Sequence, residues 1–220
     1  GARGGATFFN GKIAGFKIFN SQLTAAQVQE LYHNPEQILP TGVSASNLRR
    51  YYPLSDYNDT GGTGGRYFQD MGADGEPAED KGSASMEFAQ PVPCPQLGLQ
   101  QSATRLYYDG TSGTDYNVEV TGHSLNEANF SIAFWGFFES DNPNTTSCCF
   151  DTSGGGTFQY FINSTAGNLT VYDGSPTATF NGAVPRDECV HVVITGDGSS
   201  PYIKCYVNGV EKTIDSGSIS

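Results

Sequence analysis

The stretch "CVHVVITGDGSSPYIKCYVNG", residues 189–209, consists of two apolar runs on either side of a polar turn. Runs rich in Val, Ile and Tyr that meet at a turn such as Asp197-Gly198 are typical of a β-hairpin. From Ala103 onwards, further short apolar runs follow one another, separated by turn residues. Such spacing is expected of a sandwich or jelly roll and not of alternating strands and helices. The sequence therefore predicts an all-β protein built as an antiparallel β-sandwich.

The register of this hairpin decides which side chains share a face. In the simplest register, Val192 faces the same side of the sheet as Cys205. Cys189 then lies on the opposite side with His191. A disulfide bond between Cys189 and Cys205 is therefore not expected, although a one-residue slip would reverse this. The five cysteines are an odd number without Cys-x-x-Cys spacing, so we expect mostly unpaired thiols.

The run "FSIAFWGFF", residues 130–138, is apolar on both of its faces. Alternate residues of a strand point to opposite sides of the sheet. Ile132 and Phe134 share one side, and Ala133 and Trp135 share the other. We therefore expect a central strand that is covered on both sides.

Composition and charge exclude several classes of protein. The 220 residues contain 28 Gly, 14 Phe and 12 Tyr but only 2 Met, which favours many short strands with tight turns around one principal core. With 11 basic and 23 acidic residues the formal charge is −12, so nucleic-acid binding is disfavoured. No apolar run is long enough to span a bilayer, and membrane insertion is not expected. An extracellular or virion-surface location fits better.

The beginning of the chain has a different pattern. "ATFFNGKIAGFKIF", residues 6–19, predicts a strand pair around the turn dipeptide Asn10-Gly11. A short helix near residues 24–33 is expected next, because Thr24 and Gln27 have the spacing of a capping box. Residues 35–46 have no periodicity and are expected to be a linker. The first Met is Met71, so we expect the chain to be processed or part of something longer.

Four stretches together resemble the laminin-G-like, concanavalin-A-like jelly-roll superfamily. They are "LRRYYPLSD", "RLYYDGTSGTDYNVEV", "FSIAFWGFF" and "ECVHVVITGDGSSPYIKCYVNGVEKTI". The resemblance implies a concanavalin-A-like sandwich. In the last stretch the family commonly has Trp shortly before a His, whereas here Cys189 precedes His191.

Residues 1–34 are similar to the unit that closes such a domain, yet they stand ahead of the rest. One interpretation is that they end a preceding copy, that residues 35–46 are a linker, and that residues 47–220 form a second sandwich without its closing strands. Tandem copies of this type are found in phage or viral fibre and surface proteins. The alternative is a permuted or swapped sandwich, which residues 1–34 complete.

Catalysis is not expected. Glycanases of this fold are similar in using a Glu-x-Asp-x-x-Glu strand, in which two carboxylates cooperate across the sugar bond. The nearest match begins at Glu139 and Asp141, but Asn144 replaces the last carboxylate and Pro143 interrupts the strand. His191 is interpreted as a packed core histidine, and the protein is predicted not to be an enzyme.

A calcium site is a weaker expectation that rests on the resemblance, because many members hold calcium at the sandwich rim. Asp70 and Asp74 in "FQDMGADG" are the candidate metal ligands, since a Gly-rich loop can fold two carboxylates around one ion. The other interpretation of this loop is a solvated acidic surface.

The leading functional hypothesis is a non-enzymatic adhesion, glycan-binding or structural module of a larger viral or phage surface protein. Its partners would be a glycan or host-surface ligand and neighbouring copies of the domain or other particle subunits. Tyr107, Tyr160 and Tyr172 could supply an aromatic platform for sugar. The alternatives are a secreted cell-surface carbohydrate-recognition domain and, less favoured, a polysaccharide hydrolase.

Overall fold

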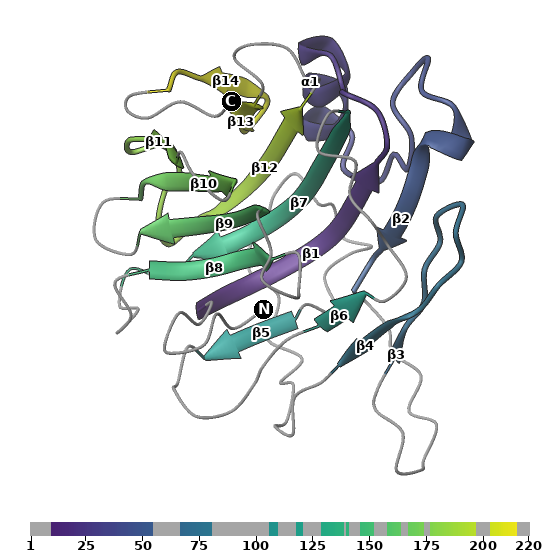
Figure 1. Ribbon diagram of the computed structural model, residues 1–220, viewed down its shortest axis with the longest axis horizontal. Helices are drawn as coiled ribbons and strands as arrows, with labels where there is room; N and C mark the ends of the chain where they lie inside the picture. Colours follow the sequence, from purple (N-terminus) through teal and green to yellow (C-terminus); the bar gives the residue numbers. More distant parts are fainter. Residues whose placement is uncertain are drawn as a thin grey trace.

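The computed structural model describes the strands, the helices and part of their connections. The described residues are 10–54, 67–80, 106–109, 118–120, 129–138, 140, 146–151, 158–163, 167–173, 177–196 and 203–214. Their strands form three sheets in which every pairing is antiparallel (Figure 1).

The largest sheet has seven strands. Its order is β14 (Val210–Lys212), β13 (Ile203–Val207), β12 (Cys189–Gly196), β7 (Phe130–Phe138), β1 (Asn10–Phe19) and β2 (Leu48–Tyr52), with β5 (Leu106–Asp109) also paired to β1. The four-stranded sheet has the order β11 (Thr177–Phe180), β10 (Leu169–Asp173), β9 (Phe158–Asn163) and β8 (Thr146–Asp151). A small sheet contains β3 (Tyr67–Phe68), β4 (Ala78–Asp80) and β6 (Val118–Val120).

The main core lies between the two larger sheets. Phe134 of β7 belongs to the same buried cluster as Val171 of β10 and Phe180 of β11. The opposite face of β7 is buried as well, because Ala133 packs with Leu31 of the helix in a second cluster. The prediction of an antiparallel sandwich with a central strand covered on both sides is therefore confirmed.

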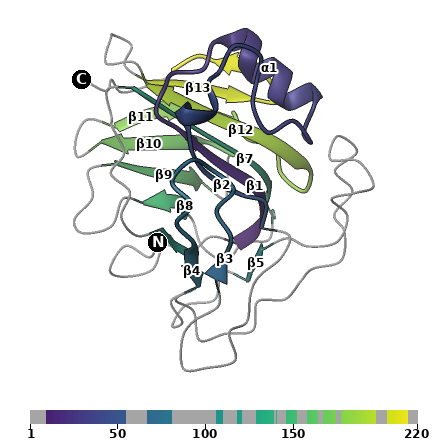
Figure 2. The same ribbon diagram turned by 90° about the vertical axis from the view of Figure 1, so that its right-hand side faces the viewer.

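The predicted helix is confirmed as α1 (Ala25–His33). Thr24 and Gln27 form the expected capping box, in which each side chain accepts a hydrogen bond from the backbone N–H of the other residue. Figure 2 shows α1 and the four-stranded sheet on opposite sides of the seven-stranded sheet. In the described part of the chain, no helix is long and apolar enough to cross a membrane.

The predicted turn at Asn10-Gly11 is wrong. Both residues lie in β1 and pair with β5, and Gly11 also pairs with Phe138 of β7. The irregular point of β1 comes later, between Ala14 and Lys17, where Gly15 has a positive φ of 59°. Pairing with two neighbouring strands outweighs the local turn preference of the dipeptide, since tertiary context decides strand formation.

In this structure β1 is an interior strand of the seven-stranded sheet, between β7 and the last strand, β2. The following segment, expected to be a linker, is fastened to the helix. The Glu30 carboxylate accepts hydrogen bonds from Gln37 Nε2 (2.6 Å), Thr41 N (2.9 Å) and Thr41 Oγ1 (2.7 Å). These bonds lower the pKa of Glu30. Residues 10–19 thus share one sheet with later strands and α1 packs on that sheet, while a tandem array stays a prediction.

The predicted hairpin register is confirmed by the pairing of β12 with β13. Cys205 pairs with Ile194 and lies in the core between the sheets, on the same side as Val192. Cys205 is a free, buried thiol, so it does not bond to Cys189. Cys189 nevertheless forms a disulfide bond, whereas the expectation that most of the five cysteines are unpaired stays a prediction.

Candidate functional site

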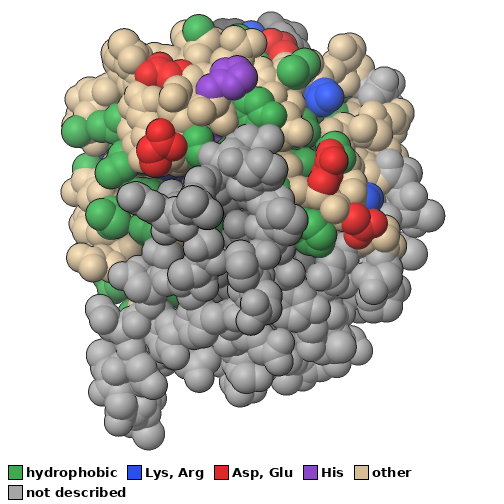
Figure 3. All heavy atoms as spheres, turned by 180° about the vertical axis from the view of Figure 1, so that it is seen from behind, with side chains coloured by type: hydrophobic (Ala, Val, Ile, Leu, Met, Phe, Trp, Pro, Cys, Tyr) green, Lys and Arg blue, Asp and Glu red, His purple; other side chains and the backbone are tan. Residues whose placement is uncertain are grey.

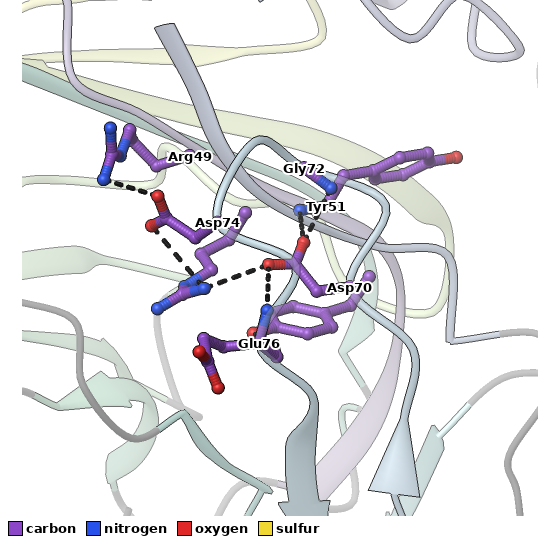
Figure 4. Close-up of polar contacts among 8 residues, drawn as sticks. Arg49, Tyr51, Asp70, Gly72, Asp74 and Glu76 are labelled. Carbon is purple, nitrogen blue, oxygen red and sulfur yellow. Dashed lines mark hydrogen bonds and ion pairs between the residues drawn. The ribbon is translucent and has the colours of Figure 1, made fainter. Parts of the chain in front are cut away.

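Asp70, one of the two predicted metal ligands, is almost fully buried in the connection between β3 and β4. Its Oδ1 accepts hydrogen bonds from the backbone N–H of Tyr51 (2.8 Å) and Gly72 (2.7 Å). Its Oδ2 accepts from the backbone N–H of Glu76 (3.2 Å) and from Arg50 Nη1 (3.1 Å) (Figure 4). Both carboxylate oxygens are therefore occupied by donors from the protein.

Asp74, the other predicted ligand, belongs to the same network. Its carboxylate forms an ion pair with Arg49, and its Oδ2 lies 3.5 Å from Arg50 Nη1 (Figure 4). The Arg50 side chain is only 1% exposed, and its Nε has no hydrogen-bond partner among the described residues. The structure thus brings Asp70 and Asp74 together, with a guanidinium between them.

The loop that carries both carboxylates runs along β2. Met71 N donates to Tyr51 O (2.8 Å), and Ala73 N donates to Leu48 O (2.8 Å). Gly72 lies so close to the strand that a Cβ atom there would be 2.5 Å from the carbonyl oxygen of Arg49. The loop therefore covers β2, the last strand of its sheet, and needs glycine at residue 72.

This donor set does not fit calcium well. Calcium takes six to eight oxygen ligands, and the two carboxylates already accept hydrogen bonds or ion pairs from Arg49, Arg50 and three backbone amides. In the part of the chain that the structure describes, no group of three or more His, Cys, Asp or Glu residues could hold a metal ion. Calcium binding at Asp70 and Asp74 itself stays a prediction.

Sequence reasoning missed the two arginines, although "LRRYY" contains a signal for them. Arg50 stands beside Arg49 in a strand whose other residues are Leu and Tyr, and a buried guanidinium requires a carboxylate partner. What the sequence did not reveal is that the partners lie in the loop after β3. Arg50 and its carboxylate partners are far apart along the chain, so no local sequence pattern indicates that they pair.

His191 is a packed core histidine, as predicted. The residue is 3% exposed, and its ring lies 5.0 Å from the ring of Trp135 and 6.3 Å from that of Tyr32, measured between centroids. Burial, with a smaller contribution from the charge of Lys17, lowers its pKa to about 3. The histidine is therefore neutral and enclosed, which does not suit a general base or a metal ligand open to solvent.

Lys17 is a second buried polar residue that sequence reasoning missed. Its Nζ donates a hydrogen bond to the backbone oxygen of Gln37 (2.6 Å) and lies 5.1 Å from the centroid of the Tyr51 ring. Burial lowers the pKa of Lys17 to about 8. The amine helps to fix residues 35–39 on the sheet, and it is not presented to solvent.

The outer face of the four-stranded sheet has a different character. Thr170 of β10 pairs with Thr179 of β11, and their hydroxyl oxygens are 3.3 Å apart. Both threonines are half-buried, whereas their neighbours Leu169 and Val171 face the core. This face therefore offers hydroxyl groups that can donate or accept hydrogen bonds.

Several predicted residues cannot be placed. Tyr107, Tyr160 and Tyr172 lie in β5, β9 and β10, but their side chains are outside the described part of the structure. Glu139, Asp141 and Asn144 are also outside the described residues. Ser140, which stands between them, is described, and its backbone N–H donates to Asp187 Oδ1 (2.9 Å). The rear view in Figure 3 shows acidic and basic side chains scattered singly over the described surface.

Comparison with known proteins agrees with this architecture. A family model described as Concanavalin A-like lectin/glucanases superfamily, of the laminin G type, matches residues 101–219, just over half of the chain. No curated protein and no solved structure matches the sequence. The matched region contains the whole four-stranded sheet and the hairpin, while β1, α1 and β2 lie ahead of it.

Proposed function

Since this chain belongs to the concanavalin A-like lectin/glucanases superfamily, we propose that it is a non-enzymatic carbohydrate-binding or adhesion module. The superfamily name covers both lectins and glucanases, so membership by itself fits either role. The proposal of a binding module is supported by the sequence near Glu139, where Asn144 stands in place of the last glycanase carboxylate.

The observation that carries this proposal is the polar outer face of the four-stranded sheet. The seven-stranded sheet is buried on both sides, by the other sheet and by α1 with the segment after it. Thr170 and Thr179, by contrast, lie on the face of the four-stranded sheet that points away from this core, and both are half-buried. Hydroxyl groups on a sheet face suit the hydrogen bonds that a sugar makes. We place the glycan-binding surface on β10 and β11.

The proposed setting is an extracellular or virion surface, in a larger viral or phage surface or fibre protein with neighbouring copies or other particle subunits as partners. The disulfide bond of Cys189 supports an oxidising environment. The net charge of −12 argues against a nucleic-acid partner and is compatible with a soluble surface protein that does not insert into a membrane.

A glycan array probed with the whole chain tests the binding role. We expect at least one glycan to bind, and we expect Thr170→Ala with Thr179→Ala to weaken that binding roughly tenfold to a hundredfold, because two hydrogen-bonding groups are lost. Thr213→Ala, at an exposed threonine beyond β14, is the matched control. Equal binding by both variants would place the site elsewhere.

Two further outcomes would change the assignment. If no glycan binds, a structural role as a spacer would remain. If the chain releases sugars from a polysaccharide, the non-enzymatic proposal is wrong, and Glu139→Gln with Asp141→Asn would show whether those carboxylates act in the cleavage.

A further inference from the structure

The loop of residues 69–76 presents two carboxylates to one buried position, and a cation already lies there. Arg50 Nη1 is 3.1 Å from Asp70 Oδ2 and 3.5 Å from Asp74 Oδ2 (Figure 4). Two carboxylates that share a site with low solvent exposure repel each other unless a positive charge lies between them. Here the positive charge comes from β2 of the same chain.

We propose that the Arg50 guanidinium takes the structural role that a metal ion between Asp70 and Asp74 would have. In this chain the guanidinium ties the loop of residues 69–76 to β2, and the loop needs no metal. The inference concerns the loop and does not depend on glycan binding.

The charges of the network support this role. Arg49 and Arg50 contribute two positive charges, and Asp70 and Asp74 contribute two negative charges. A divalent cation would therefore add charge to a neutral cluster. It would also have to displace the Arg50 side chain, which is 1% exposed and enclosed by protein.

The hydrogen bonds to the Asp70 carboxylate also support the proposed role of Arg50. Asp70 Oδ1 accepts two backbone N–H groups, and Oδ2 accepts a third in addition to the guanidinium. The hydrogens of these amides carry partial positive charge and point at the oxygens that a cation would need. Asp70 is thus arranged as an acceptor for protein donors, which is a different arrangement from a calcium ligand set.

The loop conformation is also fixed by contacts that involve no side-chain oxygen. Backbone N–H groups of Met71, Ala73 and Asp74 donate to carbonyl oxygens of β2, at 2.8, 2.8 and 3.2 Å. Gly72 lies against the backbone of β2, where a side chain has no room. Arg50 and these backbone bonds together hold the loop.

The first test measures thermal unfolding of the whole chain with excess calcium and with a chelator, together with hydrogen exchange at residues 69–76. We expect the same Tm and the same protection of the loop in both conditions. A saturable rise of Tm with calcium, which would show that the folded state binds the ion, would overturn the proposal.

The second test replaces the cation. Arg50→Gln should lower Tm by roughly 6 to 20 °C, because it leaves Asp70 buried without its counter-charge, and should speed exchange of the Gly72 and Glu76 amides. Arg49→Gln is the matched control. We expect it to lower Tm much less, because the Arg49 side chain is 39% exposed and solvent screens its ion pair with Asp74.

If Arg50→Gln does not fold, Asp74→Asn provides the milder variant, since the Asp74 side chain is 15% exposed. We expect it to fold and to show faster exchange in the loop, again without a response to calcium. Unchanged loop protection in this variant would contradict the proposed role of the guanidinium as the group that joins the two carboxylates.

Discussion

At the scale of single residues, the sandwich buries ionisable side chains in two different ways. The charge of Arg50 is balanced by Asp70 and Asp74, whereas Lys17 and His191 are buried without a carboxylate contact among the described residues. The charged form of a buried basic side chain is unfavourable when no negative charge lies nearby. Burial accordingly lowers the pKa of both Lys17 and His191. These two residues should therefore make stability depend on pH.

We predict that His191 makes the protein less stable in acid. Folding lowers its pKa from 6.5 to about 3, so between these values the unfolded chain binds a proton that the folded chain does not. The free energy of unfolding should then decrease as pH falls through this window, by up to about 1.4 kcal/mol per pH unit from this group. Urea unfolding at a series of pH values measures the slope.

The variant His191→Phe isolates this contribution, because Phe can pack beside Trp135 and does not titrate. We expect a shallower decrease of stability between pH 6.5 and pH 3 than in the wild type. His33→Phe, at the exposed end of α1, is the control that retains the buried histidine. An identical slope in His191→Phe and the wild type would contradict the prediction.

At the scale of secondary structure elements, local signals and long-range pairing had different predictive value. The sequence predicted α1 correctly, since its capping box and its apolar face are contained within about ten residues. It predicted a turn at Asn10-Gly11 incorrectly, because the two residues pair with strands that are far away in sequence. The hairpin register was also predicted correctly, since Val192 and Cys205 face the same side of the sheet, although both faces of β12 and β13 are buried.

The capping box makes a prediction at this scale. Thr24→Ala removes the side-chain acceptor for the Gln27 N–H and should cost about 1 kcal/mol of stability, or roughly 2 to 4 °C in Tm. Thr24→Ser keeps an acceptor and should stay close to the wild type. Calorimetry of the three proteins measures the difference, and a Tm loss in Thr24→Ser equal to that in Thr24→Ala would argue against the cap.

At the scale of the whole molecule, the position of β1 matters most. It is an early segment of the chain, yet it pairs with β7 on one side and with β2 on the other. The family match covers residues 101–219 and does not include it. A sheet that lost β1 would expose the edges of both neighbours, and unpaired edges are unfavourable.

We predict that a chain of residues 35–220 does not unfold cooperatively on its own, because β7 and β2 then lack the strand between them. A synthetic peptide of residues 1–34, added in trans, should restore a cooperative transition measured by circular dichroism. A peptide with the same residues in scrambled order is the control. Cooperative unfolding of residues 35–220 alone would favour a sandwich that is independent of the first segment.

The sequence by itself determined the all-β class, the covered central strand, the short helix and the hairpin register, because periodicity and capping act over a few residues. It also indicated that Asp70 and Asp74 lie close together in one loop, as candidate ligands of one ion. Only the tertiary structure decided that Arg50 lies between them and that β1 lies between β7 and β2. Both depend on contacts between distant segments, whose partners are selected by packing and charge in the folded chain and leave no local pattern.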